Sequence, residues 1–154
     1  MHIIFRKRVS CLSKYLTLVL IGCFIFTSCT KSDPPLTPEQ QVVQYLTGTG
    51  NKYWRIKEIY VNAVPVALTS SQLEYFKTYT IYASIETNSG TFVDKDNSMG
   101  TWELKTAGHI TETITNNISG PIVLDLTINH LDANNMDVQY TANGQTVRSV
   151  YYAN

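Results

Sequence analysis

The sequence predicts an all-β fold, an antiparallel up-and-down barrel of about eight strands. After Gly50, apolar and polar residues alternate with a period of two, which is typical of strands buried on one face. The connections between these segments are short and include no crossover helix, so neighbouring strands are expected to pair as hairpins. A meander of this kind must close or form a sandwich to protect its edges. Sequential hairpins favour the barrel over a Greek-key sandwich.

Two short helices are predicted beside the strands. Residues 37–40, Thr-Pro-Glu-Gln, form a capping box with proline at the first helical position, and Gly48 ends this N-terminal helix. Residues 71–74, Ser-Gln-Leu-Glu, predict a second capping box and an inter-strand helix that ends at residue 76 or 77. A helix of about ten residues is not stable alone, so the first one must pack on the barrel.

The strands follow in order along the chain. The first covers residues 54–61 and shifts phase at Lys57-Glu58, which indicates a β-bulge. A strand of mixed phase is expected at residues 78–85. The alternation is cleanest in residues 122–128, where four aliphatic residues share one face. Two further strands are expected to begin at Gly90 and at Gly100, and another is expected at residues 110–115.

The last two strands are predicted with their register. Asn143-Gly144 is the strongest short signal for a hairpin with a two-residue type I′ turn. Counting outward from it pairs Tyr140 with Val147, Val138 with Ser149, and Met136 with Tyr151. Gln139 then pairs with Arg148 on the opposite face. Turn chemistry and hydrophobic pattern therefore agree on one register.

The first 28 residues have the organisation of an export signal. Basic residues precede an apolar run of 12 residues, 15–26, which suits a signal peptide and is too short to span a bilayer well. Residues 26–29, Phe-Thr-Ser-Cys, resemble the lipobox of bacterial lipoproteins. That resemblance implies lipidation of Cys29, cleavage before it, and stable attachment by acyl chains such as palmitate. A secretory cleavage site and a short membrane anchor are the alternatives.

Three segments follow from this: a signal peptide at 1–28, a proline-containing tether at 29–37, and the barrel domain at 38–154. Loss of the signal leaves eight basic against twelve acidic residues, a charge of about −4. This balance argues against nucleic-acid binding and electrostatic membrane binding. Two of the three cysteines leave with the signal, so the barrel has no disulfide and depends on one apolar core.

Several short motifs carry a family resemblance. Residues 46–56 (LTGTGNKYWRI), with Gly90-Thr91-Phe92 and Gly100-Thr101-Trp102, resemble the lipocalin-like domains of Bacteroidota lipoproteins over about residues 45–154. The family implies a barrel and, loosely, ligand binding. In lipocalins a Gly-x-Trp motif packs its indole at the closed end, under an arginine. Trp54 matches the tryptophan, although Gly50 lies four residues before it, and Arg148 is the candidate arginine, although its pairing points it outward.

No sequence motif predicts a metal site or a catalytic site. Asp94-x-Asp96-x-Ser98 spaces oxygen atoms like a calcium loop, but Met99 and Lys105 stand where that loop needs glycine and glutamate. A solvated hairpin loop explains it better. His109 and His130 have no second ligand at metal spacing. No nucleophile elbow, paired carboxylates or Ser/His arrangement is present. The sequence therefore predicts a non-catalytic protein with neither a metal nor a cofactor.

Aromatic residues are the remaining signal, with two interpretations. They line an apolar cavity that holds a small hydrophobic or amphipathic ligand, or they fill a solid core. An eight-stranded barrel is wide enough for either. The candidate pocket residues are Trp54, Tyr82, Phe92, Trp102, Tyr140 and Tyr151.

The filled barrel gives the alternative function, a module that docks a protein of the cell envelope. Tyr53, Tyr79 and Tyr152 are expected to be exposed for that contact, because tyrosine is favoured at interfaces. In both cases the expected location is the outer membrane, since Thr30 follows Cys29 where inner-membrane lipoproteins of enterobacteria carry aspartate. Periplasmic and surface sides both remain open.

Overall fold

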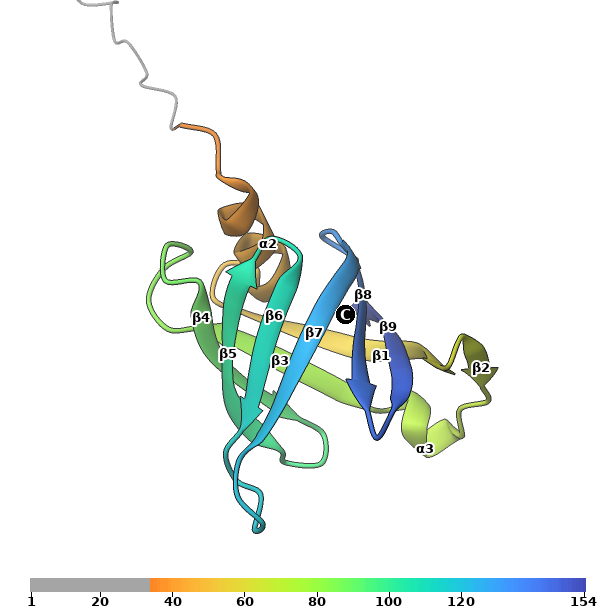
Figure 1. Ribbon diagram of the computed structural model, residues 1–154. Helices are drawn as coiled ribbons and strands as arrows, with labels where there is room; N and C mark the ends of the chain where they lie inside the picture. Colours follow the sequence, from red (N-terminus) through yellow and green to blue (C-terminus); the bar gives the residue numbers. More distant parts are fainter. Residues whose placement is uncertain (1–33) are drawn as a thin grey trace, which may run out of the picture. The chain divides into compact units, whose positions relative to one another are not determined.

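A computed structural model describes residues 34–154, and within them the chain folds into a closed antiparallel β-barrel (Figure 1). This confirms the predicted fold class, including one helix before the strands and one between them. Contacts place residues 36–154 in one compact unit. The signal peptide, Cys29 and the first part of the tether lie outside the described residues. The helices and strands are α2 (Pro38–Thr47), β1 (Asn51–Val61), β2 (Val64–Val66), α3 (Ser70–Leu73), β3 (Phe76–Ile81), β4 (Ser89–Asp94), β5 (Met99–Thr106), β6 (His109–Ile114), β7 (Ile122–Leu131), β8 (Asn135–Ala142) and β9 (Gln145–Ala153).

Strand β1 closes the barrel because it pairs with two partners. Its first half pairs with β3 from Asn51 to Arg55, and its second half pairs with β9 from Trp54 to Val61. The register shifts between Ile56 and Glu58, which confirms the predicted bulge at Lys57. The other strands pair in sequence order, and β2 pairs only with the far end of β1. The barrel proper thus consists of β1 and β3 to β9.

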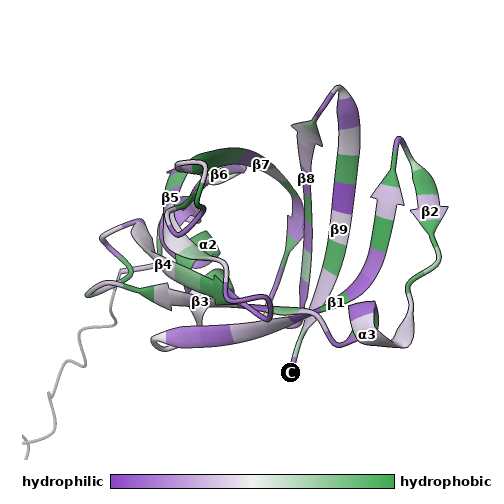
Figure 2. Ribbon diagram, turned by 90° about the horizontal axis from the view of Figure 1, so that it is seen from below, coloured by the Kyte–Doolittle hydropathy of each residue, from purple (hydrophilic) through white to green (hydrophobic). Residues whose placement is uncertain are grey.

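Helix α2 covers one end of the barrel (Figures 1 and 2). Thr37 and Gln40 form the predicted capping box, and Gly48 follows the last turn with a positive φ of 61°. Val43 and Leu46 are fully buried against the strands. The Trp54 indole N–H donates to the Leu46 carbonyl oxygen at 2.9 Å, which satisfies a group that the helix end leaves free. This end of the barrel is therefore closed.

Because Gly90 has no side chain, Trp102 of β5 can pass over β4 and reach β3. Trp102 lies opposite Gly90 in the β4–β5 pair, and its indole N–H donates to the Thr80 carbonyl oxygen of β3 at 3.1 Å. A Cβ atom at position 90 would lie 1.9 Å from that oxygen and 2.7 Å from Trp102 Nε1. The Gly-Thr-aromatic motif at residues 90–92 therefore marks a place where the backbone of β3 and the Trp102 ring closely approach Gly90.

The predicted β8–β9 hairpin is confirmed pair by pair, from Tyr140–Val147 to Met136–Tyr151, with Gln139 opposite Arg148. Two other details of the prediction are wrong. Strand β3 covers residues 76–81 instead of 78–85, and the second helix begins two residues earlier than expected and ends at Leu73 instead of residue 76 or 77. Its capping box joins Thr69 and Gln72, because Thr69 has the extended backbone that an N-cap requires. No helix among residues 34–154 is long and apolar enough to cross a membrane.

Candidate functional site

A cavity of about 430 Å³ occupies the half of the barrel that α2 does not cover. This volume lies within the range of small-molecule sites, roughly 300–1,000 Å³. Helix α3 and the β4–β5 turn contribute Ser71, Gln72 and Asp96 to its lining, so these segments mark the mouth. The barrel is thus packed with side chains at the α2 end and contains a cavity at the other end.

The wall of the cavity combines apolar side chains with polar and charged ones. Alternating residues of β1, β4 and β6 to β9 turn their side chains inward, as the period of two requires. The apolar lining consists of Ile56, Ile59, Phe92, Ile114, Leu124, Leu126, Val138 and Val147. An apolar molecule of modest size would find complementary surface here.

One ion pair crosses the interior of the barrel. Lys77 of β3 and Glu112 of β6 belong to strands that are not neighbours, and both line the cavity. The Lys77 Nζ atom lies 2.7 Å from Glu112 Oε2 and 3.0 Å from Oε1. The Lys77 side chain is 11% exposed and that of Glu112 0%. Tyr79, on the same face of β3, donates its hydroxyl to Glu112 Oε1.

Burial and neighbouring charges shift the pKa values of this cluster. Desolvation lowers the pKa of Lys77, but the adjacent Glu112 carboxylate together with Tyr151 and Asp94 outweighs it and leaves that pKa above its ordinary value. Burial, reinforced by the same carboxylate, raises the pKa of the Tyr79 hydroxyl well above its ordinary value. Burial also raises the pKa of the Tyr151 hydroxyl, which faces the same cavity. At neutral pH the cluster therefore holds a charged lysine and protonated tyrosines.

A second carboxylate lies nearer the mouth. The Tyr75 hydroxyl donates to Asp94 Oδ2 at 2.9 Å, and burial raises the pKa of this tyrosine. Asp94 Oδ1 accepts from the backbone N–H groups of Asp96 and Ser98, both at 2.9 Å. These bonds fix the β4–β5 turn, which explains the Asp-x-Asp-x-Ser spacing as turn structure. Among residues 34–154, no group of three or more Asp, Glu, His or Cys side chains could hold a metal ion.

Three of the six predicted pocket residues line the cavity: Phe92, Tyr140 and Tyr151. Trp54 and Trp102 do not, since they pack in the core of the closed half at 0% and 1% exposure. Tyr82 was predicted inside, but it follows the end of β3 and is 58% exposed. The aromatic residues thus divide between a solid end and an open end.

Lys77, Tyr79 and Glu112 line the cavity although no sequence pattern predicted them there. Ending the second helix at residue 76 or 77 concealed that Lys77 and Tyr79 share the inward face of β3. Tyr79, predicted to be exposed, is 1% exposed. The available signal was the phase of β6, where Glu112 stands midway between the inward Ile110 and Ile114. A charged residue in an apolar phase is rare unless it is paired.

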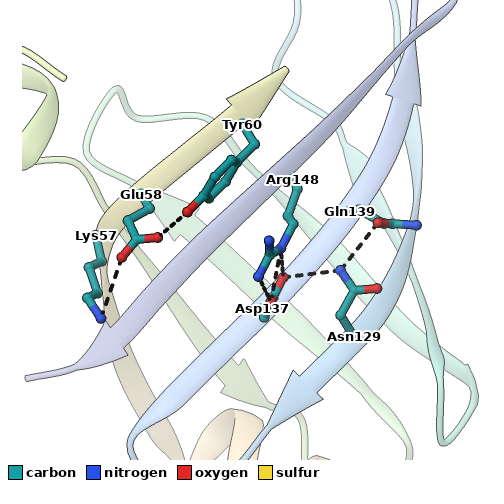
Figure 3. Close-up of polar contacts among 7 residues, drawn as sticks. All are labelled: Lys57, Glu58, Tyr60, Asn129, Asp137, Gln139 and Arg148. Atoms are coloured by element: carbon teal, nitrogen blue, oxygen red, sulfur yellow. Dashed lines mark hydrogen bonds and ion pairs between the residues drawn. The ribbon is translucent and has the colours of Figure 1, made fainter. Parts of the chain in front are cut away.

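Lys52, and not Arg148, covers the tryptophan of the closed end. Its Nζ atom lies 4.3 Å from the centre of the Trp54 ring and donates to the carbonyl oxygens of Tyr45 and Ala133 at 2.9 and 2.6 Å. Arg148 points outward, as its pairing predicts, and its guanidinium lies 4.9 Å from the Tyr60 ring (Figure 3). The role that the resemblance implies for an arginine is filled by a lysine from β1.

Comparison with known proteins adds no further constraint. No family model, curated protein or solved structure matches the chain. The function must therefore be argued from the cavity itself. Most of the exposed large apolar residues lie at the open end of the barrel, on β2, α3, the β6–β7 loop and the ends of β4, β5 and β7: Val64, Val66, Leu73, Val93, Met99, Ile118, Ile122 and Val123.

Proposed function

We propose that this protein is a lipid-anchored lipoprotein of the outer membrane with a lipocalin-like barrel that binds a small amphipathic molecule. The observation that carries the binding proposal is the cavity, in which eight apolar side chains and several hydroxyl groups surround a buried Lys77–Glu112 pair. A stable barrel does not need an internal ion pair, because an apolar pair of similar volume serves stability as well or better. A polar group in an otherwise apolar pocket orients a ligand.

Two further observations support this function. The apolar residues around the open end give a ligand with an apolar body a favourable route to the cavity. Helix α2 covers the opposite end of the barrel and therefore does not obstruct the mouth.

The alternative, an interaction module with a filled core, has less support. The cavity removes the premise of a filled barrel, and Tyr79 is buried instead of exposed. Tyr53 is half-buried and stacks on Phe76, with ring centres 4.6 Å apart. Of the three tyrosines named for a partner contact, one is internal and one is engaged with its own barrel.

Native mass spectrometry of the protein purified from its own cells tests the binding proposal. We expect a co-purifying small molecule. Val147→Trp, which places a large ring in the cavity, should abolish it. Thr146→Trp, on the opposite face of the same strand, should retain it. An empty parent protein that also binds no lipid or heme from a panel would contradict the proposal.

Membrane fractionation of Cys29→Ser tests the anchor. This substitution removes the proposed lipidated thiol and leaves the barrel sequence unchanged. We expect the variant to lose its lipid mass and to leave the membrane fraction, or to accumulate as unprocessed precursor. Normal processing with unchanged membrane attachment would contradict lipidation. Protease treatment of intact cells then distinguishes the periplasmic from the surface side.

A further inference from the structure

The charges inside the cavity balance each other where a ligand would meet them. Lys77 and Glu112 are in direct contact at 2.7 Å, so the pair presents no net charge to the cavity. Asp94 is the next carboxylate, and its two oxygens already accept one hydroxyl and two backbone N–H groups. Lys95 and Asp96 line the cavity at its mouth, where Lys95 pairs with Glu74 at 2.8 Å and Asp96 is exposed to solvent. A full charge on a ligand deeper inside the barrel would therefore meet no free counter-charge.

The hydrogen-bonding capacity of the pair is not exhausted. An ammonium group has three N–H donors, and Lys77 directs two of its contacts to Glu112. A carboxylate has about four acceptor positions, and the contacts from Lys77 and Tyr79 fill three on Glu112. One donor thus remains on Lys77, whose side chain is 11% exposed, whereas Glu112 is fully buried behind it. The hydroxyls of Tyr140, Ser149 and Tyr151 line the same space and can both donate and accept.

From this balance we propose that the cavity selects an uncharged ligand whose polar group both donates and accepts hydrogen bonds, such as a hydroxyl on an apolar body. The proposal rests on the proposed binding function and specifies its ligand class. A hydroxyl can accept from the partly exposed Lys77 and donate to a hydroxyl of Tyr140, Ser149 or Tyr151 without disturbing the Lys77–Glu112 contact. A carboxylate would face Glu112 and Asp94, and an ammonium would face Lys77. Either ion would lose its hydration and gain a like-charged neighbour.

Three ligands that share the same alkyl chain and differ in their polar group test the selectivity for an uncharged ligand. Decanol, decanoate and decylammonium are titrated into the purified chain at pH 7 by calorimetry, below their micelle concentrations, with decane as an apolar reference in native mass spectrometry. We expect decanol to bind at least about tenfold more tightly than either ion, a difference of about 1.4 kcal/mol. Decanoate or decylammonium binding as tightly as decanol would overturn the ligand class and leave cavity binding intact. Failure of all four to bind would overturn the binding function itself.

Charge variants make the test independent of any single ligand. Glu112→Gln keeps the shape and leaves Lys77 without its counter-charge, so the preference should move to decanoate. Lys77→Met leaves Glu112 uncompensated, so the preference should move to decylammonium. If one variant fails to fold, the other still decides. Unchanged preference for decanol in either folded variant would overturn the role of the ion pair in selectivity.

Discussion

Two ion pairs in this barrel have similar geometry and opposite surroundings. Inside, Lys77 contacts Glu112 at 2.7 Å, with side chains 11% and 0% exposed. Outside, Arg148 contacts Asp137 at 2.6 Å, with side chains 43% and 14% exposed. The outer pair keeps its arginine in contact with water, whereas the inner pair loses nearly all of its hydration on folding. A short distance alone therefore does not say what an ion pair contributes.

The outer pair belongs to a polar network that runs across neighbouring strands (Figure 3). Arg148 donates to both Asp137 oxygens through Nε and Nη2, and Asn129 donates to Asp137 at 3.1 Å. These groups lie on β9, β8 and β7, as cross-strand neighbours on the water side. Such contacts support the register that the Asn143-Gly144 turn already sets. The inner pair has no such structural reason, which is why we connect it with a ligand.

The largest expected effect comes from breaking the inner pair on one side. Lys77→Met removes the counter-charge of a fully buried Glu112 and should lower the free energy of unfolding by about 3–5 kcal/mol. Lys57→Met is the matched control, since Lys57 lies on the outer surface at 56% exposure. Urea unfolding followed by circular dichroism compares them. Equal midpoints for the two variants would contradict the contrast between inside and outside.

Replacing both partners should have the opposite sign. Lys77→Met with Glu112→Leu and Tyr79→Phe leaves neither a buried charge nor a buried hydroxyl without its acceptor, and we expect the free energy of unfolding to stay equal or to rise by about 1–4 kcal/mol. The same triple variant should lose the preference for decanol over decane. A triple variant as unstable as Lys77→Met would instead show that the pair is needed for folding.

How far the sequence could predict this contrast differs between the two pairs. The outer network follows from local signals, because a two-residue turn fixes the register and the register puts Gln139 and Arg148 on one face. The inner pair joins β3 and β6, which are 35 residues apart and not hydrogen-bonded to each other. No local pattern encodes such a contact across the lumen, which depends on the closure of the barrel.

The aromatic residues show the same limit. Alternation correctly predicted inward orientation for Trp54, Phe92, Trp102, Tyr140 and Tyr151. It could not predict which end of the barrel each one occupies. That division depends on α2, which covers the half containing both tryptophans and leaves Phe92, Tyr140 and Tyr151 to the cavity. Depth along a barrel is a tertiary property that period-two patterns do not carry.

A smaller effect is expected from the hydroxyl that supports the inner carboxylate. Tyr79→Phe removes one donor to Glu112 without changing the ring and should lower the free energy of unfolding by about 1.5–3 kcal/mol. Tyr53→Phe is the control, because the Tyr53 ring stacks on Phe76 on the outer side. Urea unfolding at pH 7 measures both. A Tyr79→Phe protein as stable as the control would mean that Glu112 does not need this donor.

The smallest expected effect concerns the outer carboxylate and depends on pH. Partial burial raises the pKa of Asp137, but hydrogen bonds from Arg148 and Asn129 outweigh it and leave that pKa below the ordinary value of about 3.9. A lowered folded-state pKa stabilises the protein above the unfolded-state pKa and loses this contribution as pH falls through the folded-state value. Asp137→Asn should therefore cost at most about 1 kcal/mol at pH 7.

That cost should disappear in acid and shrink in salt. Urea unfolding of the parent and Asp137→Asn at pH 7, 5, 3.5 and 2.5 should give curves that converge below about pH 3.9. At pH 7, 1 M NaCl shortens the screening length to about 3 Å and should reduce the difference, while the effect of Lys77→Met should persist because its partner is buried. A difference at Asp137 that survives both acid and salt would show that the outer contact acts through packing and not through charge.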